Sequence, residues 1–485
     1  MLATVRVIPC FIHALLIVSA AAAQSTQPTT IPSVTAPMPR AELTGLYQKE
    51  LGARYSPAIS DKLFESHLLM EQYFANPSQR KRAIAAIEKI GLDPNILGRI
   101  ARIRLGWPKL EGGIYYINER YGPHEVLYFL GLPSGYERTR SCPLVIKLPT
   151  ADAFVTDPRP TADEVTKIYT GWMTEELKRH PDAIVLMPLL NLDELWGPSY
   201  AGMNYVFAPM QHAADRVNID PARVYLIGHS MSAHAAWNLA LHYPTYFAAF
   251  NALAGAASAD WQRVRLMDLR NVLPVVWHDA DDKVIKVESS RSLVKILRLK
   301  KCEVDYEETR GVGHVPDDSI LERAYQKLRA RARELYPRHV SQQSVRPDTL
   351  FNRNDWLQIW QPIKPGKERR LLFRGGYGFM IVYDNTFMAD ATLSAGNRID
   401  ATTDNVASLR FYLNDQMVDF SKPVTIVVNK KGRFEDKVKS SVEEMLKDQL
   451  FMGRGWRYYT GVIDIDFGAA PSTSRSAGGA GGRDQ

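Results

Sequence analysis

The chain has 485 residues, of which 45% are hydrophobic and 23% charged, and this composition excludes disordered, collagen-like and coiled-coil proteins. A single core rarely grows beyond about 250–300 residues, so we expect two or three domains. The formal net charge of +7 is modest and no long block of Lys and Arg occurs, which argues against a nucleic-acid partner.

The amino-terminal residues predict a leader followed by a tether. Residues 1–23 contain a basic residue and then an apolar run that ends in three alanines, which is typical of a cleaved secretory signal. An uncleaved anchor is the alternative, but no stop-transfer pattern follows, so we expect no stable membrane insertion after cleavage. Residues 24–39, rich in Ser, Thr and Pro, predict a disordered linker, and residues 469–485 predict a disordered tail. We therefore expect a secreted or periplasmic protein.

The three cysteines are too few for a disulfide scaffold or a multi-cysteine zinc site. Cys10 lies inside the leader, which leaves Cys142 and Cys302 in the mature chain. In an exported protein these two can form a disulfide or remain buried thiols. The apolar runs beside them favour the unpaired alternative.

The elements predicted for residues 40–338 change in character near residue 111. Residues 40–110 carry apolar side chains three or four positions apart, which predicts a helical region. In residues 111–338 short apolar runs alternate with helical patterns, which predicts an α/β domain whose mostly parallel sheet has helices on both faces. The predicted strands are 126–132, 143–148, 183–188, 223–228, 247–253, 273–278 and 303–307, and the predicted helices are 163–179, 233–243, 288–299 and 319–334.

Residues 346–468 have a different pattern, in which apolar and polar residues alternate within short segments. This alternation predicts a small antiparallel β domain with one helix, although it does not fix the strand order. The predicted strands are 390–393, 407–413, 424–428 and 458–466, and the predicted helix is 441–450.

The strongest sign of chemistry is the sequence Gly228-His229-Ser230-Met231-Ser232. It follows a predicted buried strand, and a helix of small residues begins directly after it. Small residues on both sides of Ser230 permit the strained turn of a nucleophile elbow, which presents the serine hydroxyl above the sheet. We therefore predict Ser230 as a nucleophile. Ser232 stands where the elbow usually has a glycine.

A serine hydroxyl becomes a good nucleophile only when a histidine, oriented by a carboxylate, removes its proton. In this fold the three residues occur in the order Ser, acid, His. Only His314 and His339 follow a plausible acid. His314 lies in a glycine-containing loop directly after the strand predicted at 303–307, whereas His339 lies in a linker, so we predict His314 as the base.

The acid must come from the loop after the strand predicted at 273–278, which offers Asp279, Asp281 and Asp282. We favour Asp282 because it precedes apolar residues that would fix its position, whereas the other two are typical turn formers. His278 beside these acids raises a metal site as an alternative. No HExxH motif or cysteine ligand accompanies it, so we predict neither a metal nor a cofactor.

Three aromatic residues in loops at the same edge of the predicted sheet are candidates for substrate binding. Trp196 and Tyr200 lie in the loop after the strand predicted at 183–188, and Trp277 precedes the acid loop. Simple packing beneath the loops is the alternative for all three.

Several stretches match a known family in addition to the elbow: 130–136 before 143–146, 217–225 leading into Gly-His-Ser-Met, and 241–244 followed by 247–249. Through them the region from Pro143 to about Pro316 resembles the α/β-hydrolase superfamily, and most closely its secreted esterase and prolyl-oligopeptidase-like branch. The resemblance implies Ser230 as nucleophile, Asp282 as acid and His314 as base.

The resemblance also implies an oxyanion hole, and here the sequence departs from the family. Members usually have a His-Gly-Gly turn after the strand that corresponds to 143–148, but this chain has Pro149-Thr150-Ala151. Proline has no N–H to donate. The expected donors are therefore the backbone N–H of Met231 and that of Thr150 or Ala151.

These observations predict a serine hydrolase that cleaves a small-molecule or polymer-linked ester through an acyl-enzyme. The helical residues 40–105 show no repeat of about 40 residues, so the propeller of the prolyl oligopeptidases is not expected. Hydrolysis of small peptides remains one alternative. A catalytically silent hydrolase-like module, with a β domain that binds a polymer, remains another.

Overall fold

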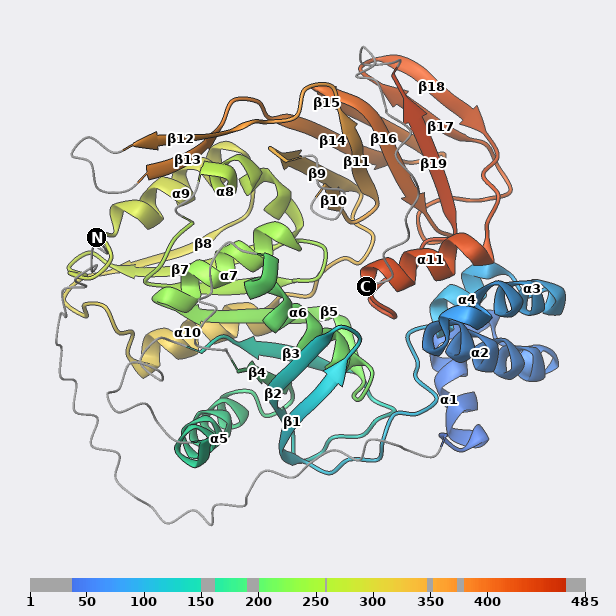
Figure 1. Ribbon diagram of the computed structural model, residues 1–485, viewed down its shortest axis with the longest axis horizontal. Helices are drawn as coiled ribbons and strands as arrows, with labels where there is room; N and C mark the ends of the chain where they lie inside the picture. The colour runs from blue at the N-terminus through green and yellow to red at the C-terminus, as the bar shows by residue number, and fades with distance from the viewer. Residues whose placement is uncertain are drawn as a thin grey trace, which may run out of the picture.

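The computed structural model describes residues 37–149, 162–189, 200–257, 260–346, 352–372 and 379–467 (Figure 1). The predicted signal, most of the predicted linker and the tail at 469–485 lie outside these ranges. The linker predicted over 24–39 is too long at its end, because Met38 is buried and donates its N–H to the carbonyl of Leu105 at 2.7 Å.

The central element is an eight-stranded sheet in the order β1-β2-β4-β3-β5-β6-β7-β8. The strands from β3 through β8 pair in parallel, whereas β1 and β2 add an antiparallel edge. This arrangement confirms the predicted fold class. The strands are β1 Gly113–Tyr121, β2 His124–Leu132, β3 Cys142–Lys147, β4 Ile184–Pro188, β5 Ile219–His229, β6 Ala249–Leu253, β7 Leu273–Asp279 and β8 Asp305–Thr309.

Helices cover both faces of this sheet, and each face has its own hydrophobic core. Helices α6, α7 and α9 pack on one face, and α5 and α10 pack on the other. In α9 the buried residues Leu293, Val294 and Leu297 form the expected apolar stripe at helical spacing. The helices are α5 Ala162–Arg179, α6 Tyr200–Ala214, α7 Met231–His242, the short α8 Asp260–Val264, α9 Glu288–Leu299 and α10 Asp318–Ala330.

Strand β1 and helix α6 were not among the predicted elements. β1 is an edge strand in which only Tyr115 and Ile117 are buried, and its apolar run ends at Asn118, Glu119 and Arg120, so the run is short. Strand β5 begins at Ile219, four residues earlier than predicted, because its first part pairs with Cys142 before an irregularity in the register.

The carboxyl-terminal region forms two main sheets, in the orders β10-β11-β16-β19 and β18-β17-β15-β14-β9, and a β12–β13 hairpin. The pairing is antiparallel except between β15 and β17. Because β9 pairs with β14, this region begins at His339 and not at the predicted residue 346. The elements are β9 His339–Ser344, β10 Arg353–Asn354, β11 Leu357–Pro362, β12 Glu368–Leu372, β13 Phe379–Tyr383, β14 Phe387–Ser394, β15 Arg398–Asp404, β16 Val406–Leu413, β17 Val424–Val428, β18 Lys431–Asp436, α11 Val442–Met452 and β19 Gly461–Asp466.

The amino-terminal helices pack against this carboxyl-terminal region, and the two share one hydrophobic core. In Figure 1 the blue helices lie beside the red helix α11. Apolar side chains from both ends of the chain, such as Ile87 and Leu97 with Leu446 and Tyr458, form this core. The amino-terminal helices are α1 Arg40–Leu51, α2 Ser60–Ala75, α3 Arg80–Ile90 and α4 Pro94–Ile100.

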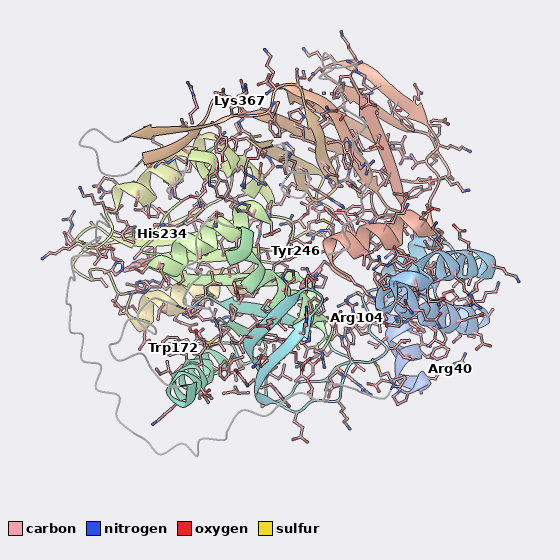
Figure 2. The ribbon with its side chains drawn as sticks, viewed as in Figure 1. Arg40, Arg104, Trp172, His234, Tyr246 and Lys367 are labelled. Carbon is pink, nitrogen blue, oxygen red and sulfur yellow. The ribbon has the colours of Figure 1, made fainter. Side chains whose placement is uncertain are left out.

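Polar contacts join this shared unit to the α/β domain. Arg104 donates to Asp215 at 2.8 Å and to the carbonyl of Arg454 at 2.7 Å, so it links all three parts of the chain. Tyr246 follows α7 and donates its hydroxyl to the carbonyl of Met452. Figure 2 shows Arg104 and Tyr246 at this junction.

Both described cysteines are buried free thiols, which confirms the unpaired alternative. Burial raises the pKa of each thiol. Cys142 begins β3, and Cys302 contacts the carbonyl of Leu266 at 3.7 Å.

The close packing of α4 on Tyr458 can be tested with Gly98→Ala, and Gly171→Ala at an open position of α5 serves as the control. A Cβ at Gly98 would lie 2.4 Å from Cδ2 of the Tyr458 ring, so Gly98→Ala should destabilise the protein by about 1–3 kcal/mol. Gly171 in α5 has nothing within 4 Å of such a Cβ, so Gly171→Ala should stabilise by about 0.5–1 kcal/mol. Urea unfolding measures both, and equal effects would contradict the proposed packing.

Candidate active site

Ser230 lies between the end of β5 and the first residue of α7, in the strained turn that the sequence predicts. Its φ of 55° and ψ of −120° are rare for a residue with a side chain. Gly228 makes the turn possible, because a Cβ there would lie 2.2 Å from the carbonyl oxygen of Ser232. The N–H of Ser230 donates to Leu253 on β6 at 2.8 Å, which ties the turn to the neighbouring strand.

Ser232, which replaces the usual glycine, stabilises this turn. Its buried hydroxyl accepts from the N–H of His229 at 2.9 Å and donates to the carbonyl of the same residue at 2.9 Å. These two bonds join the first turn of α7 to the end of β5. The departure from the family pattern therefore adds hydrogen bonds within the elbow.

The structure brings together the three residues predicted as a triad. Ser230 Oγ lies 2.8 Å from His314 Nε2, and His314 Nδ1 lies 2.8 Å from Asp282 Oδ2. A carboxylate only accepts, so Nδ1 carries the proton and Nε2 is free to accept from the serine hydroxyl. The His314 side chain is 18% exposed and that of Asp282 is fully buried, so only the serine end of the chain of bonds is accessible.

Asp282 is held as a carboxylate by the turn that follows it. Its Oδ1 accepts from the N–H of Val284 at 2.8 Å and of Ile285 at 3.0 Å. Burial raises the pKa of this carboxyl, but the hydrogen bonds from His314 and from the two backbone N–H groups outweigh burial. The net pKa therefore lies below the usual value for aspartate, and Asp282 keeps its charge next to the imidazole.

The other candidates for acid and base have different partners. Asp279 accepts from Thr309 at 2.8 Å and from the N–H of Val312 at 3.1 Å, and Asp281 accepts from the N–H of Gly311 at 3.0 Å. They connect the acid loop to the loop that carries His314, as expected of turn-forming residues. His339 is paired with Asp390 in the β region at 2.7 Å.

The remaining predicted site residues are only partly described. Met231 is the first residue of α7, where a backbone N–H has no acceptor within the helix. Thr150, Ala151 and Trp196 lie outside the described residues, as does the side chain of Tyr200, which begins α6.

Trp277 is described, and its surroundings favour the packing alternative over substrate binding. It is 1% exposed, belongs to the core beneath α5 and α10, and donates its indole N–H to Thr309 at 3.1 Å.

Two histidines that were not predicted as site residues contact the triad. His229 donates Nε2–H to the carbonyl of His314 at 2.9 Å. His278, which the sequence suggested only as a possible metal ligand, has its Nε2 3.2 Å from Asp282 Oδ2. Adjacency in sequence to Ser230 and to the acid loop was the available signal for both.

The two bonds of Ser232 predict a test of the elbow's stability. Ser232→Ala leaves the partly buried backbone N–H and C=O of His229 without these partners, and should lower the free energy of unfolding by about 1–3 kcal/mol. Ser289→Ala is the control, because Ser289 is exposed and bonds only the nearby carbonyl of Lys286, and it should change stability by less than about 0.5 kcal/mol. Guanidinium unfolding of both variants measures the difference; an unchanged Ser232→Ala would refute this role.

One segment of the chain matches a known protein family. Residues 210–302 match the Esterase family, described as "Putative esterase", and this segment contains Ser230 and Asp282 but ends before His314. A search of curated proteins found no match.

Among solved structures, the chain is similar to a thermostable esterase at 23% identity and a TM-score of 0.38, covering 46% of this chain and 64% of the esterase. It is also similar to a "putative dipeptidyl aminopeptidase IV" from Bacteroides ovatus, at 14% identity and a TM-score of 0.35, covering 45% of this chain and 35% of the other. A ferulic acid esterase from Anaeromyces mucronatus gives 15% identity and a TM-score of 0.32 over 47% of this chain and 93% of the other. The chain thus spans less than two thirds of the first two proteins.

The order and the mostly parallel pairing of the central strands are those of an α/β-hydrolase fold, and residues 210–302, which lie within this sheet and its helices, are similar to the Esterase family.

Proposed function

We propose that the protein is a serine esterase that cleaves its substrate through a covalent acyl-enzyme. The observation that carries this proposal is the chain of hydrogen bonds from Asp282 through His314 to the hydroxyl of Ser230, with both distances at 2.8 Å. A chain of these three residue types at such distances is the arrangement that activates a serine.

In the proposed reaction, His314 Nε2 takes the proton of Ser230 as its Oγ attacks the ester carbonyl carbon. The imidazolium then returns this proton to the departing alkoxide, which leaves an acyl group on Ser230. Water attacks the acyl-enzyme with His314 again as the base, and release of the acid restores the serine. Asp282 holds the imidazole in the required tautomer throughout.

The negative charge on the tetrahedral intermediate requires backbone donors close to Ser230. We propose the N–H of Met231 as one donor, since it follows the nucleophile and begins α7. The N–H of Thr150 or Ala151 is the proposed second donor, because Pro149 has none.

The arrangement of the chain favours an ester over a peptide, and we propose a small-molecule or polymer-linked ester as substrate. The amino-terminal region consists of helices that share a core with the β region, so it has no resemblance to a propeller. Figure 2 shows His234 on α7 and Arg40 on α1 at opposite sides of the molecule. The described helical region offers no propeller of the kind that would filter peptides by size.

We also propose that residues 1–23 direct export and are removed. None of the helices in the described part of the chain is long and apolar enough to span a membrane. Mass determination of the protein recovered from the producing cell tests the proposed cleavage before Gln24.

A fluorophosphonate probe tests the nucleophile directly. The chain without residues 1–23 should form a covalent adduct and hydrolyse a simple acetyl ester, and Ser230→Ala should abolish both because no other atom replaces Oγ. Ser289→Ala should behave as the wild type. Absence of labelling in the wild type would support the silent binding module, and faster cleavage of peptide amides than of esters would support the peptidase.

The lowered pKa of Asp282 predicts the form of the pH dependence. Asp282 stays ionised below the usual aspartate pKa of about 3.9, so this carboxylate adds no second proton to the loss of activity as the pH falls from neutral to about 4. The logarithm of kcat/KM for the acetyl ester should therefore fall with a slope of one. A slope of two would mean that Asp282 titrates in the same range.

A matched pair of amide variants tests the assignment of the acid. Asp282→Asn should lower kcat by about 10³–10⁴-fold, because an amide does not hold the imidazole in the required tautomer. Asp281→Asn is the control with near wild-type kcat, because the amide oxygen can still accept from the N–H of Gly311 and the lost ion pair with Arg310 is exposed and weak. Equal kcat values for the two variants would refute Asp282 as the acid.

A further inference from the structure

His278, near the end of β7, has a fully buried side chain that lies directly behind Asp282. Its Nε2 lies 2.8 Å from the carbonyl oxygen of Ile285 and 3.2 Å from Asp282 Oδ2. Its Nδ1 lies 2.7 Å from the hydroxyl of Ser290, which is itself buried in the first turn of α9. Both ring nitrogens are thus engaged inside the protein.

These partners fix the position of the ring proton. A carbonyl oxygen and a carboxylate oxygen only accept, so Nε2 must carry a proton. The hydroxyl of Ser290 can donate to Nδ1 and complete the neutral ring. The N–H at Nε2 donates to the carbonyl of Ile285, and Nε2 also lies 3.2 Å from Asp282 Oδ2. The carboxylate that accepts from His314 therefore has the positive end of a second imidazole close to it.

Ile285 completes a closed arrangement around the acid. Its N–H donates to Asp282 Oδ1 at 3.0 Å, and its carbonyl accepts from His278 at 2.8 Å. The turn from Asp282 to Ile285 is therefore attached to β7 at both ends. Without His278, the buried carbonyl of Ile285 would lose its donor and the carboxylate would lose a nearby positive dipole.

We propose, on the basis of the proposed esterase function, that His278 is a positioning residue that fixes Asp282 and limits how strongly this carboxylate attracts the proton of His314. A carboxylate with fewer N–H groups around it is a stronger acceptor. Removal of the Nε2–H of His278 would therefore stabilise the protonated form of His314, and the enzyme would lose its base at a higher pH.

Other titratable groups surround His278 and Asp282, and they are not altered when residue 278 is substituted. Because each is present in every variant, a difference in pH profile between the variants comes from residue 278. These groups are His229 at the end of β5, His234 on α7, Asp279 at the end of β7, Asp281 and Arg310 in the adjoining loops, and Glu288 and Arg291 on α9.

Two amide variants of the full chain distinguish this role from simple packing. In His278→Gln the side-chain nitrogen reaches the position of Nε2, whereas in His278→Asn it reaches only the position of Nδ1. The profile of kcat/KM against pH is measured with an acetyl ester, and fluorophosphonate titration corrects for the amount of active protein.

His278→Asn should move the acid limb of the profile upward by about 0.5 to 1 on the pH scale and reduce kcat/KM about 10-fold, and His278→Gln should restore both toward the wild type. Equal midpoints of the acid limb in the wild type and His278→Asn, or no difference between the two variants, would overturn the proposal. An inactive wild type that does not label would overturn the esterase function itself, whereas an active wild type with unshifted variants would overturn only the role of His278.

Discussion

The strained backbone at Ser230 is the constraint on which the site depends. A residue with a side chain at positive φ costs about 1–3 kcal/mol, and this cost must be offset by contacts around the turn. Here the carbonyl of Leu253 in the sheet accepts from the N–H of Ser230, and Gly228 and Gly255 allow the backbone to pass closely. Ser232 adds two bonds to His229. The elbow is therefore held from β5, β6 and α7 at once.

The parallel sheet explains how distant residues meet at this elbow. Since the carboxyl ends of parallel strands share one edge, the loops after β5, β7 and β8 deliver Ser230, Asp282 and His314 to the same place. The loops are then fixed to one another, because Asp279 and Asp281 accept from the backbone that precedes His314. The two aspartates that do not contact His314 thus help to position it.

The α/β domain could be predicted from sequence because its signals are local. A buried parallel strand has a continuous apolar run and α9 has a clear apolar stripe, so the helix at 288–299 was predicted with its observed bounds. The order of Ser, acid and His then left few candidates. The edge strand β1 and the buried contacts of His278 have no such signal, because one is half-exposed and the other depends on Ser290 and Ile285 being folded around it.

The arrangement of the chain ends could not be predicted, because it depends on contacts between residues several hundred positions apart. Asn95 accepts from Thr460 at 2.7 Å, and Arg454 forms an ion pair with Glu71 at 2.6 Å. Periodicity indicates that each segment has an apolar face, but not which segment covers it. Since the helices and the β region bury their apolar faces against each other, neither is free to fold as an independent lid over the α/β domain.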